Sequence, residues 1–247
     1  MKKNLKRREF LKKAGVAGAA AVGASTLAAP AIAGGHQEWI ICSAFGKAGL
    51  LGQAIQAFGD NINRYSDKLK IKVYHSGELV PGLESLDAVR SGAAQASYGA
   101  PYYWTNVSDA IEFVATCPFG MNAMEQNAWC YYGGGIEEAD KIYNALGLKF
   151  LPMGNTGNQM GGWFNKEINT PADYQGLKMR MPGLGGRTIE KLGATPVLLA
   201  GPDVLPSLSS GAVDAAEWIC PAADLGAGLY QAAKSYYGPG CMSLQLY

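Results

Sequence analysis

Short apolar runs alternate with longer amphipathic stretches along residues 34–247. Apolar residues recur every three or four positions in 50–65, which predicts a helix with one buried face. They alternate with polar residues in 69–74, and 39–43 is apolar except for Ser43 at its end, so both are predicted strands. The same patterns predict further strands at 96–100, 148–153, 159–165, 177–181, 195–198 and 213–219, and helices at 81–92, 137–146, 186–192 and 203–210. This alternation is typical of α/β proteins, in which ligands bind at the carboxyl ends of strands, often between two lobes.

The first 33 residues have the layout of an export signal. A basic segment around Arg7 and Arg8 precedes a mildly apolar stretch at 14–29, which is too short and too weakly apolar for a membrane span. An A-x-A cleavage site follows at 31–33. This order predicts a twin-arginine signal peptide over residues 1–33 and a periplasmic mature chain. The alternative is a basic amphipathic helix that belongs to the mature protein.

Composition restricts the partners of the mature chain. Without residues 1–33, 214 residues are left, with 14 basic and 19 acidic side chains and a formal charge of −5. This balance argues against a nucleic-acid partner, which would require a basic face. No other stretch has 18 uncharged apolar residues, so no further membrane-spanning helix is predicted. The five cysteines are widely spaced and form no CxxC pair, which argues against a zinc site.

Three polar positions lie in apolar or aromatic surroundings that suit a small ligand pocket. Arg180 interrupts the apolar run 177–181, and its planar fork of donors matches a carboxylate, although a structural salt bridge is the simpler alternative. Glu217, next to Trp218, could be a core residue, an acid–base group or a ligand of a hard cation. Gln159 is an ordinary polar residue when it is considered alone.

Several long blocks occur in the order found in one known family. LKMRMPGLGG at 177–186 is followed by LGATPVLLAG at 192–201 and by GAVDAAEWICPAADLGAGLYQAAKSYY at 211–237. Upstream segments at 71–104 and 117–135 agree with the same pattern. From about Trp39 to Gly240 the chain resembles the solute-binding subunits of TRAP transporters. Within them it is similar to the DctP-type branch that binds 2-oxo acids and related carboxylates.

This resemblance implies two α/β lobes that close on a small carboxylate by a hinge motion. It implies that Arg180 pairs with the ligand carboxylate and that Tyr102 and Trp218 wall the pocket. It also implies a bound Na⁺ or Ca²⁺, held by the side-chain oxygen of Gln159, the carboxylate of Glu217 and the backbone oxygen of Trp218. The implied protein partners are the TRAP membrane subunits and, in the full-length form, a second copy of the chain.

The resemblance also predicts how the chain is divided. The expected segments are the signal peptide 1–33, a first lobe 34–155, a second but incomplete lobe 156–236 and the start of a crossing segment at 237–247. After Gly240 the tail departs from the family, whose members continue into a crossing strand and several helices. A second departure lies at 44–47, where the family often has a Trp-Pro-like turn that faces the ligand.

Two alternatives to a binding protein stay open at this point. The first is a truncated, non-functional fragment of such a protein. The second is an enzyme exported by the twin-arginine route. The second is disfavoured because the sequence has no metal or flavin motif and no nucleophile–base pair. Its two histidines, His36 and His75, lie near the cleaved terminus and just after a predicted strand.

Overall fold

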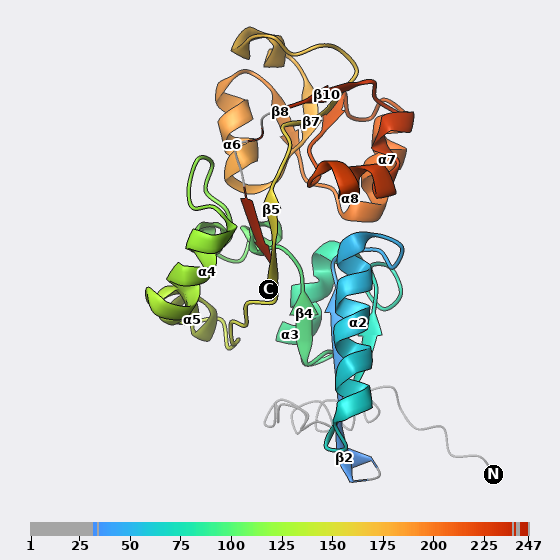
Figure 1. The fold of residues 1–247 in the computed structure, drawn as a ribbon, viewed down its shortest axis with the longest axis vertical. Helices are drawn as coiled ribbons and strands as arrows, with labels where there is room; N and C mark the ends of the chain where they lie inside the picture. Colours follow the sequence, from blue (N-terminus) through green and yellow to red (C-terminus); the bar gives the residue numbers. More distant parts are fainter. Residues whose placement is uncertain (1–31, 34, 239, 241–242, 247) are drawn as a thin grey trace, which may run out of the picture. The chain divides into compact units, whose positions relative to one another are not determined.

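The computed structural model describes residues 32–33, 35–238, 240 and 243–246 (Figure 1). Residues 1–31, which make up most of the predicted signal peptide, lie outside the described residues, as does part of the predicted crossing segment at 237–247. Among the described residues, no helix combines the length and the apolar character needed to cross a membrane.

The first sheet is built around β2 (His36–Ser43). β3 (Leu69–Tyr74) and β4 (Ala96–Tyr98) pair with β2 in parallel, and β1 (Ile32–Ala33) pairs with it antiparallel. Parallel neighbours need crossover connections. These are α2 (Leu50–Tyr65) between β2 and β3, and the short helices η1 (Gly82–Glu84) and α3 (Ser85–Arg90) between β3 and β4.

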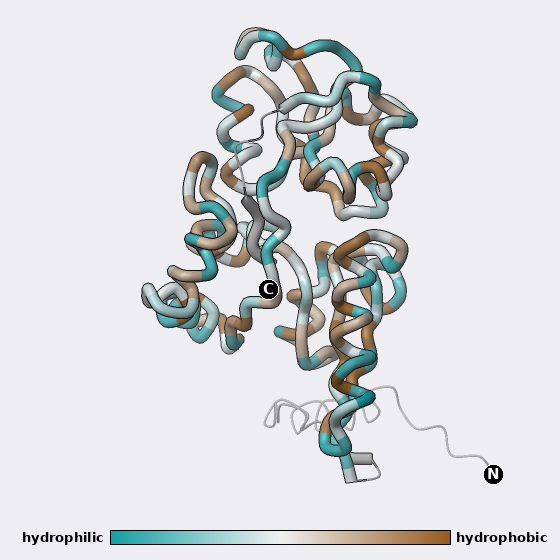
Figure 2. The backbone as a smooth tube through the Cα atoms, viewed as in Figure 1, coloured by the Kyte–Doolittle hydropathy of each residue, from teal (hydrophilic) through white to brown (hydrophobic). Residues whose placement is uncertain are grey.

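Helix α2 covers this sheet with the face that its periodicity predicts. Leu51 and Ile55 are buried, and apolar positions recur along the helix between hydrophilic ones (Figure 2). Gly59 lets the helix approach β3 closely, because a Cβ at this position would lie 3.0 Å from Val73 and 3.3 Å from Ile71. The helix is therefore positioned by packing, and the loop before it is held at the carboxyl end of β2.

The second sheet has the strand order β10-β6-β9-β7-β8. β7 is parallel to both of its neighbours, while β6 is antiparallel to β9 and β10. Helix α6 (Gly183–Lys191) connects β7 to β8, α7 (Gly201–Ser209) connects β8 to β9, and α8 (Pro221–Ala227) follows β9. The strands are β6 (Gly162–Phe164), β7 (Lys178–Arg180), β8 (Thr195–Val197), β9 (Ala215–Ala216) and β10 (Ser235–Tyr237).

Each sheet has its own hydrophobic cluster. The second-sheet cluster contains Phe164, Met179 and Ala215, all with no exposed surface. The first-sheet cluster includes β2 and α2 side chains and also Ile219, which comes from the loop after β9. Packing therefore holds this loop, which carries Glu217 and Trp218, against the first sheet.

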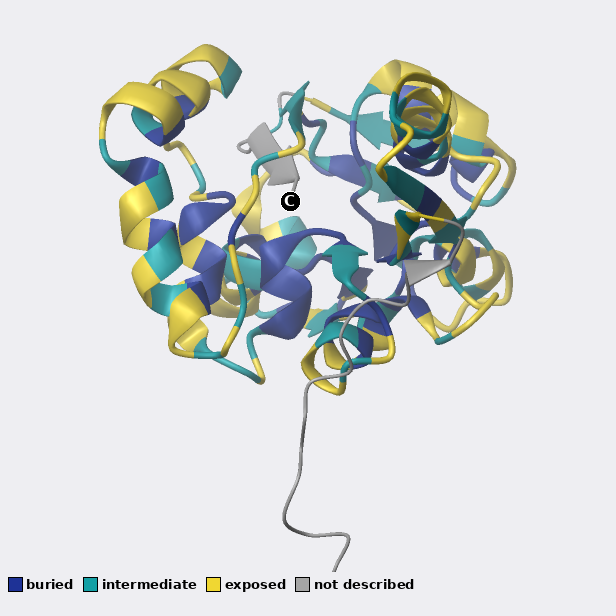
Figure 3. Ribbon diagram, turned by 90° about the horizontal axis from the view of Figure 1, so that it is seen from below, coloured by how far each residue is buried: buried dark blue, intermediate teal, exposed yellow. Residues whose placement is uncertain are grey.

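Helical segments follow the first sheet. η2 (Pro101–Trp104) is buried at all four positions and leads to η3 (Asp109–Val114). Figure 3 shows that exposed residues lie mainly on the outer faces of the helices, with buried residues on their inner sides. The other segments are α4 (Ala123–Tyr132), α5 (Gly135–Asn144), the short helices η4 (Pro171–Tyr174) and η5 (Leu229–Gln231), and the antiparallel pair β5 (Gly154–Asn158) and β11 (Ser243–Leu246).

Most of the predicted elements are present, and several strands are shorter than predicted. The predicted strand at 148–153 is wrong: the residues are irregular, and the strand β5 begins only at Gly154. Phe150 is buried against Tyr143, at 5.3 Å between ring centroids, and Pro152 has no N–H to donate to a ladder. Helix α4 was not predicted, because its apolar residues do not gather on one face.

Candidate functional site

Arg180 is the last residue of β7, and its side chain is 1% exposed. β7 lies between β8 and β9, so its carboxyl end is flanked by the loops that follow both strands. A buried guanidinium is stable only if its charge and donors are matched by partners. The surroundings of Arg180 are therefore built around this charge.

Glu217 is the main partner of Arg180. Arg180 Nη1 donates to Glu217 Oε2 at 2.7 Å and to the Glu217 backbone oxygen at 2.8 Å. The Glu217 side chain is also 1% exposed. In addition, the guanidinium carbon lies 5.0 Å from the ring centroid of Trp218, a cation–π distance. The structure thus brings three predicted site residues together. Two of them, Arg180 and Glu217, form the salt bridge that was the simpler alternative for Arg180.

One edge of the guanidinium is only partly used. Nη2 donates to the hydroxyl of Tyr103 at 3.2 Å, and Nε has no hydrogen-bond partner among the described residues. Nε and Nη2 together form the side-on fork that can grip a carboxylate with two parallel hydrogen bonds. Arg180 can therefore accept an anion on this edge while Nη1 stays on Glu217.

Gln159 lies next to the same loop. Its side chain is 3% exposed, and Nε2 donates to the backbone oxygen of Trp218 at 3.2 Å. A half-turn of this amide would present Oε1 in place of Nε2. The remaining oxygen of Glu217, Oε1, has no hydrogen-bond partner in the part of the chain that the structure describes.

These groups fit a hard cation. Na⁺ and Ca²⁺ prefer oxygen ligands, and the site offers an amide oxygen, a carboxylate oxygen and a backbone carbonyl oxygen. No group of three or more His, Cys, Asp and Glu side chains that could hold a metal ion occurs in the described part of the chain. A cation bound by Gln159, Glu217 and Trp218 would thus combine one carboxylate with two neutral oxygens.

Burial shapes the electrostatics of the site. Burial raises the pKa of Glu217 to about 8; Arg180 opposes this shift and the nearby Asp224 adds to it. Burial also raises the pKa of Asp224, despite three hydrogen bonds that lower it. Two buried carboxyl groups thus lie close to one guanidinium, an arrangement that favours the arrival of further positive charge.

Tyr103, the neighbour of the predicted pocket-wall residue Tyr102, contacts Arg180 through its hydroxyl. The two rings are adjacent, at 5.1 Å between centroids, but successive residues of η2 point in different directions. Tyr102 is buried and packs against the start of α6, where Gly183 has φ of +62° and a Cβ would lie 2.7 Å from Tyr102. Sequence patterns marked the aromatic run at 102–104 but not which tyrosine faces the arginine.

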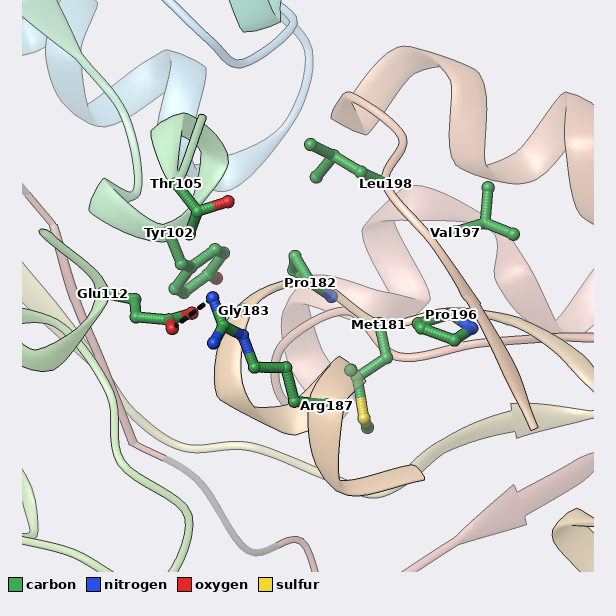
Figure 4. Close-up of a pocket in the computed structure, with 11 residues that line it drawn as sticks. Tyr102, Thr105, Glu112, Met181, Pro182, Gly183, Arg187, Pro196, Val197 and Leu198 are labelled. Atoms are coloured by element: carbon green, nitrogen blue, oxygen red, sulfur yellow. Dashed lines mark ion pairs between the residues drawn. The ribbon is translucent and has the colours of Figure 1, made fainter. Parts of the chain in front are cut away.

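Two pockets border the site residues. A pocket of about 410 Å³ is lined by Trp218, by the start of α7 and by 45–52, which includes part of the segment that departs from the family. A second pocket, of about 220 Å³, is lined by Tyr102 together with Glu112 and Arg187 (Figure 4). Tyr102 and Trp218, the two predicted pocket walls, therefore line different pockets in the structure.

Arg187 joins α6 to η3 beside the smaller pocket. Its Nη2 donates to Asp109 at 2.8 Å and lies 3.0 Å from Glu112 Oε1, the ion pair drawn in Figure 4. Glu112 is buried, and burial raises the pKa of its carboxyl although Arg187 lowers it. The folded chain thus keeps a proton on Glu112 more readily than the unfolded chain does.

The free energy of unfolding of the Glu112→Gln variant is expected to fall less than that of the wild type as the pH rises. A raised folded pKa favours the folded state below the ordinary value of 4.5, and this contribution is lost as pH rises through the folded pKa. Glutamine cannot titrate, so the variant should gain stability relative to the wild type over that window. Urea unfolding midpoints from about pH 4 to about pH 8 measure the difference. A difference that does not change with pH would contradict the prediction.

Comparison with known proteins identifies the family. Residues 45–245 match the model of the DctP family, described as bacterial extracellular solute-binding protein, family 7. The chain belongs to this family. It is 46% identical over 173 residues to a monocarboxylate 2-oxoacid-binding periplasmic protein of Nostoc sp., a match that covers 70% of this chain and 48% of the relative. The predicted resemblance is confirmed.

Two solved structures show the same fold. A TRAP periplasmic solute binding protein of Pseudoalteromonas atlantica with bound sodium and pyruvate matches with a TM-score of 0.81 and 37% identity, over 85% of this chain and 65% of its own. One of Colwellia psychrerythraea with bound calcium and pyruvate matches with a TM-score of 0.78 and 37% identity, over 85% and 66%.

The predicted α/β periplasmic binding protein fold is confirmed by these matches. The chain spans about half the length of its curated relative and about two thirds of the solved structures. The family is one of solute-binding proteins and not of enzymes, so the alternative of an exported enzyme is set aside.

Proposed function

We propose that this family 7 chain captures a small monocarboxylate, such as a 2-oxo acid, for delivery to TRAP membrane subunits. The observation that carries the proposal is the buried Arg180 at the carboxyl end of β7, whose guanidinium edge has Nη2 on the Tyr103 hydroxyl and Nε without a partner among the described residues. The ligand carboxylate would accept from this edge, beside the Tyr103 hydroxyl. Relatives with bound pyruvate support a ligand of this class.

The same proposal includes a bound cation. Gln159, Glu217 and the Trp218 backbone oxygen would hold Na⁺ or Ca²⁺, which are bound in the two relatives. When bound, the ion supplies positive charge beside the ligand carboxylate. Glu217 would then have two roles, because Oε2 holds Arg180 in place and Oε1 would be left to bind the ion.

Capture would require the site to open and close. Arg180, Glu217 and Gln159 are almost fully buried, so a ligand reaches them only if the surrounding elements separate. The lobes proposed for this motion are residues 34–155 and 156–236, and residues 237–247 would begin the crossing segment. These boundaries stay predictions, as does a homodimer of the full-length form.

The test is a titration of the purified chain with pyruvate and other 2-oxo and 2-hydroxy acids, followed by tryptophan fluorescence. Trp218 lies against Arg180, so its emission should change on binding. A saturable change is expected with the acids and not with pyruvamide, which lacks the carboxylate charge. Failure of every acid to bind a natively folded chain would overturn the proposal. An unpacked chain that binds ANS would instead favour the truncated-fragment alternative.

We further propose that the chain reaches the periplasm by the twin-arginine route. The family and its relative are described as extracellular and periplasmic, and Arg7 and Arg8 support this particular route. Replacing both with lysine should prevent the chain from accumulating in the periplasm. Fractionation of cells with and without the twin-arginine translocase measures this. Undiminished export in cells that lack the translocase would contradict the proposal.

A further inference from the structure

The buried acidic residue Asp224 lies behind the site, in the first turn of α8. Asp224 is 0% exposed, and family resemblance did not single it out. We propose that Asp224 is a positioning residue that aims the Trp218 carbonyl at the cation. This inference deepens the proposed function and rests on it.

Asp224 accepts hydrogen bonds from two strands and from the loop after β9. Oδ1 accepts from the backbone N–H of Ile219 at 2.8 Å. Oδ2 accepts from Trp163 Nε1 on β6 at 3.1 Å and from the Tyr236 hydroxyl on β10 at 2.9 Å. The rings of Trp163 and Tyr236 are stacked at 4.1 Å between centroids, so both donors are fixed. The carboxylate is thus a rigid anchor whose two oxygens are both in use, and it is not itself a cation ligand.

The contact with Ile219 determines the direction of the Trp218 carbonyl. The C=O of Trp218 and the N–H of Ile219 belong to one planar peptide unit and point to opposite sides of the chain. Since Asp224 holds the N–H, the C=O is turned away from α8. It points to Gln159, whose Nε2 lies 3.2 Å away. The Gln159 side chain and the Trp218 carbonyl, two of the proposed cation ligands, therefore lie together because Asp224 holds the N–H on the opposite side of the peptide unit.

The next peptide unit is locked as well. The backbone oxygen of Ile219 accepts from the N–H of Met160 at 2.8 Å, which ties the loop to the residue after Gln159. The hydrogen bond from Ile219 to a charged acceptor also polarises the Trp218–Ile219 peptide and increases the negative charge on its oxygen. Asp224 thus influences both the direction of the Trp218 carbonyl and the strength with which its oxygen can bind a cation.

Asp224→Asn tests this role. Asparagine has nearly the same shape, but its NH₂ group would face either the Ile219 N–H, in place of Oδ1, or both the Trp163 and Tyr236 donors, in place of Oδ2. In either orientation the carboxylate charge is lost and donors of the network lose their acceptor. We expect affinity for Ca²⁺, measured by calorimetry without ligand, to fall about tenfold or more. We also expect the gain in pyruvate affinity that Na⁺ or Ca²⁺ confers on the wild type to shrink by a similar factor.

Tyr236→Phe is the matched control. It removes one hydrogen bond to Oδ2 but leaves the contact between Ile219 and Oδ1, so it should lower stability while it preserves the response to cation. Equal cation responses in Asp224→Asn and the wild type would overturn the inference. So would an equal loss in both variants at matched thermal stability, since that indicates a purely structural role. If the wild type binds pyruvate without any response to cation, the cation part of the proposed function fails, whatever Asp224 does.

Discussion

Arg180→Ala is expected to lower affinity for pyruvate by roughly 30-fold or more, because truncating one partner of a buried charge pair costs about 2–5 kcal/mol. The alanine removes Nε and Nη2, the two donors proposed to bind the carboxylate, and also the counter-charge of Glu217. The fluorescence titration proposed above measures the affinity. No other described side chain combines a permanent positive charge with this degree of burial.

Arg180→Lys separates charge from geometry. Lysine keeps the charge and so spares Glu217 from unpaired burial, but it cannot offer two parallel donors to a carboxylate. We expect intermediate affinity from this variant, and unchanged affinity from Arg90→Ala, which removes a surface arginine paired with Asp87. Circular dichroism shows whether each variant is folded. A folded Arg180→Ala chain with wild-type affinity would refute the carboxylate role of Arg180.

Glu217→Gln is expected to remove most of the cation response of ligand binding. The glutamine oxygen can still accept from Arg180, so the arginine keeps a partner, but the negative charge opposite the ion is lost. Affinity for pyruvate in excess Na⁺ or Ca²⁺ should fall about tenfold or more relative to the wild type. In chelator and without Na⁺, the two proteins should differ much less. The ratio of the two affinities is the quantity to measure.

The control for this prediction is Glu138→Gln, which neutralises an exposed carboxylate on α5 that pairs with Lys141. It should keep the full cation response, because an exposed pair contributes little. A Glu217→Gln chain that responds to cation as strongly as the wild type would show that the ion does not use this carboxylate. Calorimetric titration of each chain with Ca²⁺ alone gives the same comparison without ligand.

Local patterns predicted the regular elements whose faces are decided by burial. The bounds of α2 and β3 agree with the predictions, because a 3.6-residue or two-residue period reports directly which side faces the core. The prediction of a strand at 148–153 was wrong because a sequence pattern indicates which residues are buried, but not whether a neighbouring strand is present to pair with them. Buried Phe150 satisfied the pattern without any ladder.

The candidate site was only partly predictable. Arg180, Glu217, Trp218 and Gln159 could be named because charge in an apolar run is costly and because the blocks around them match a family. Tyr103 could not, since neighbouring tyrosines look alike in sequence and only the turn of η2 distinguishes them. Asp224 could not either, because its donors come from residues 163, 219 and 236 and carry no shared motif.

The amino-acid sequence was enough to predict the α/β class, the family and the chemistry of a buried arginine. These features can be recognised from residues that are neighbours in the sequence, because they depend on periodic burial and on a charge placed in an apolar run. Only the tertiary structure decided which atoms of that arginine are occupied, which tyrosine it meets and which carboxylate orients the Trp218 carbonyl. Those relations join residues up to 77 positions apart. They depend on how strands pair and loops pack, and no local pattern encodes the directions in which the side chains point.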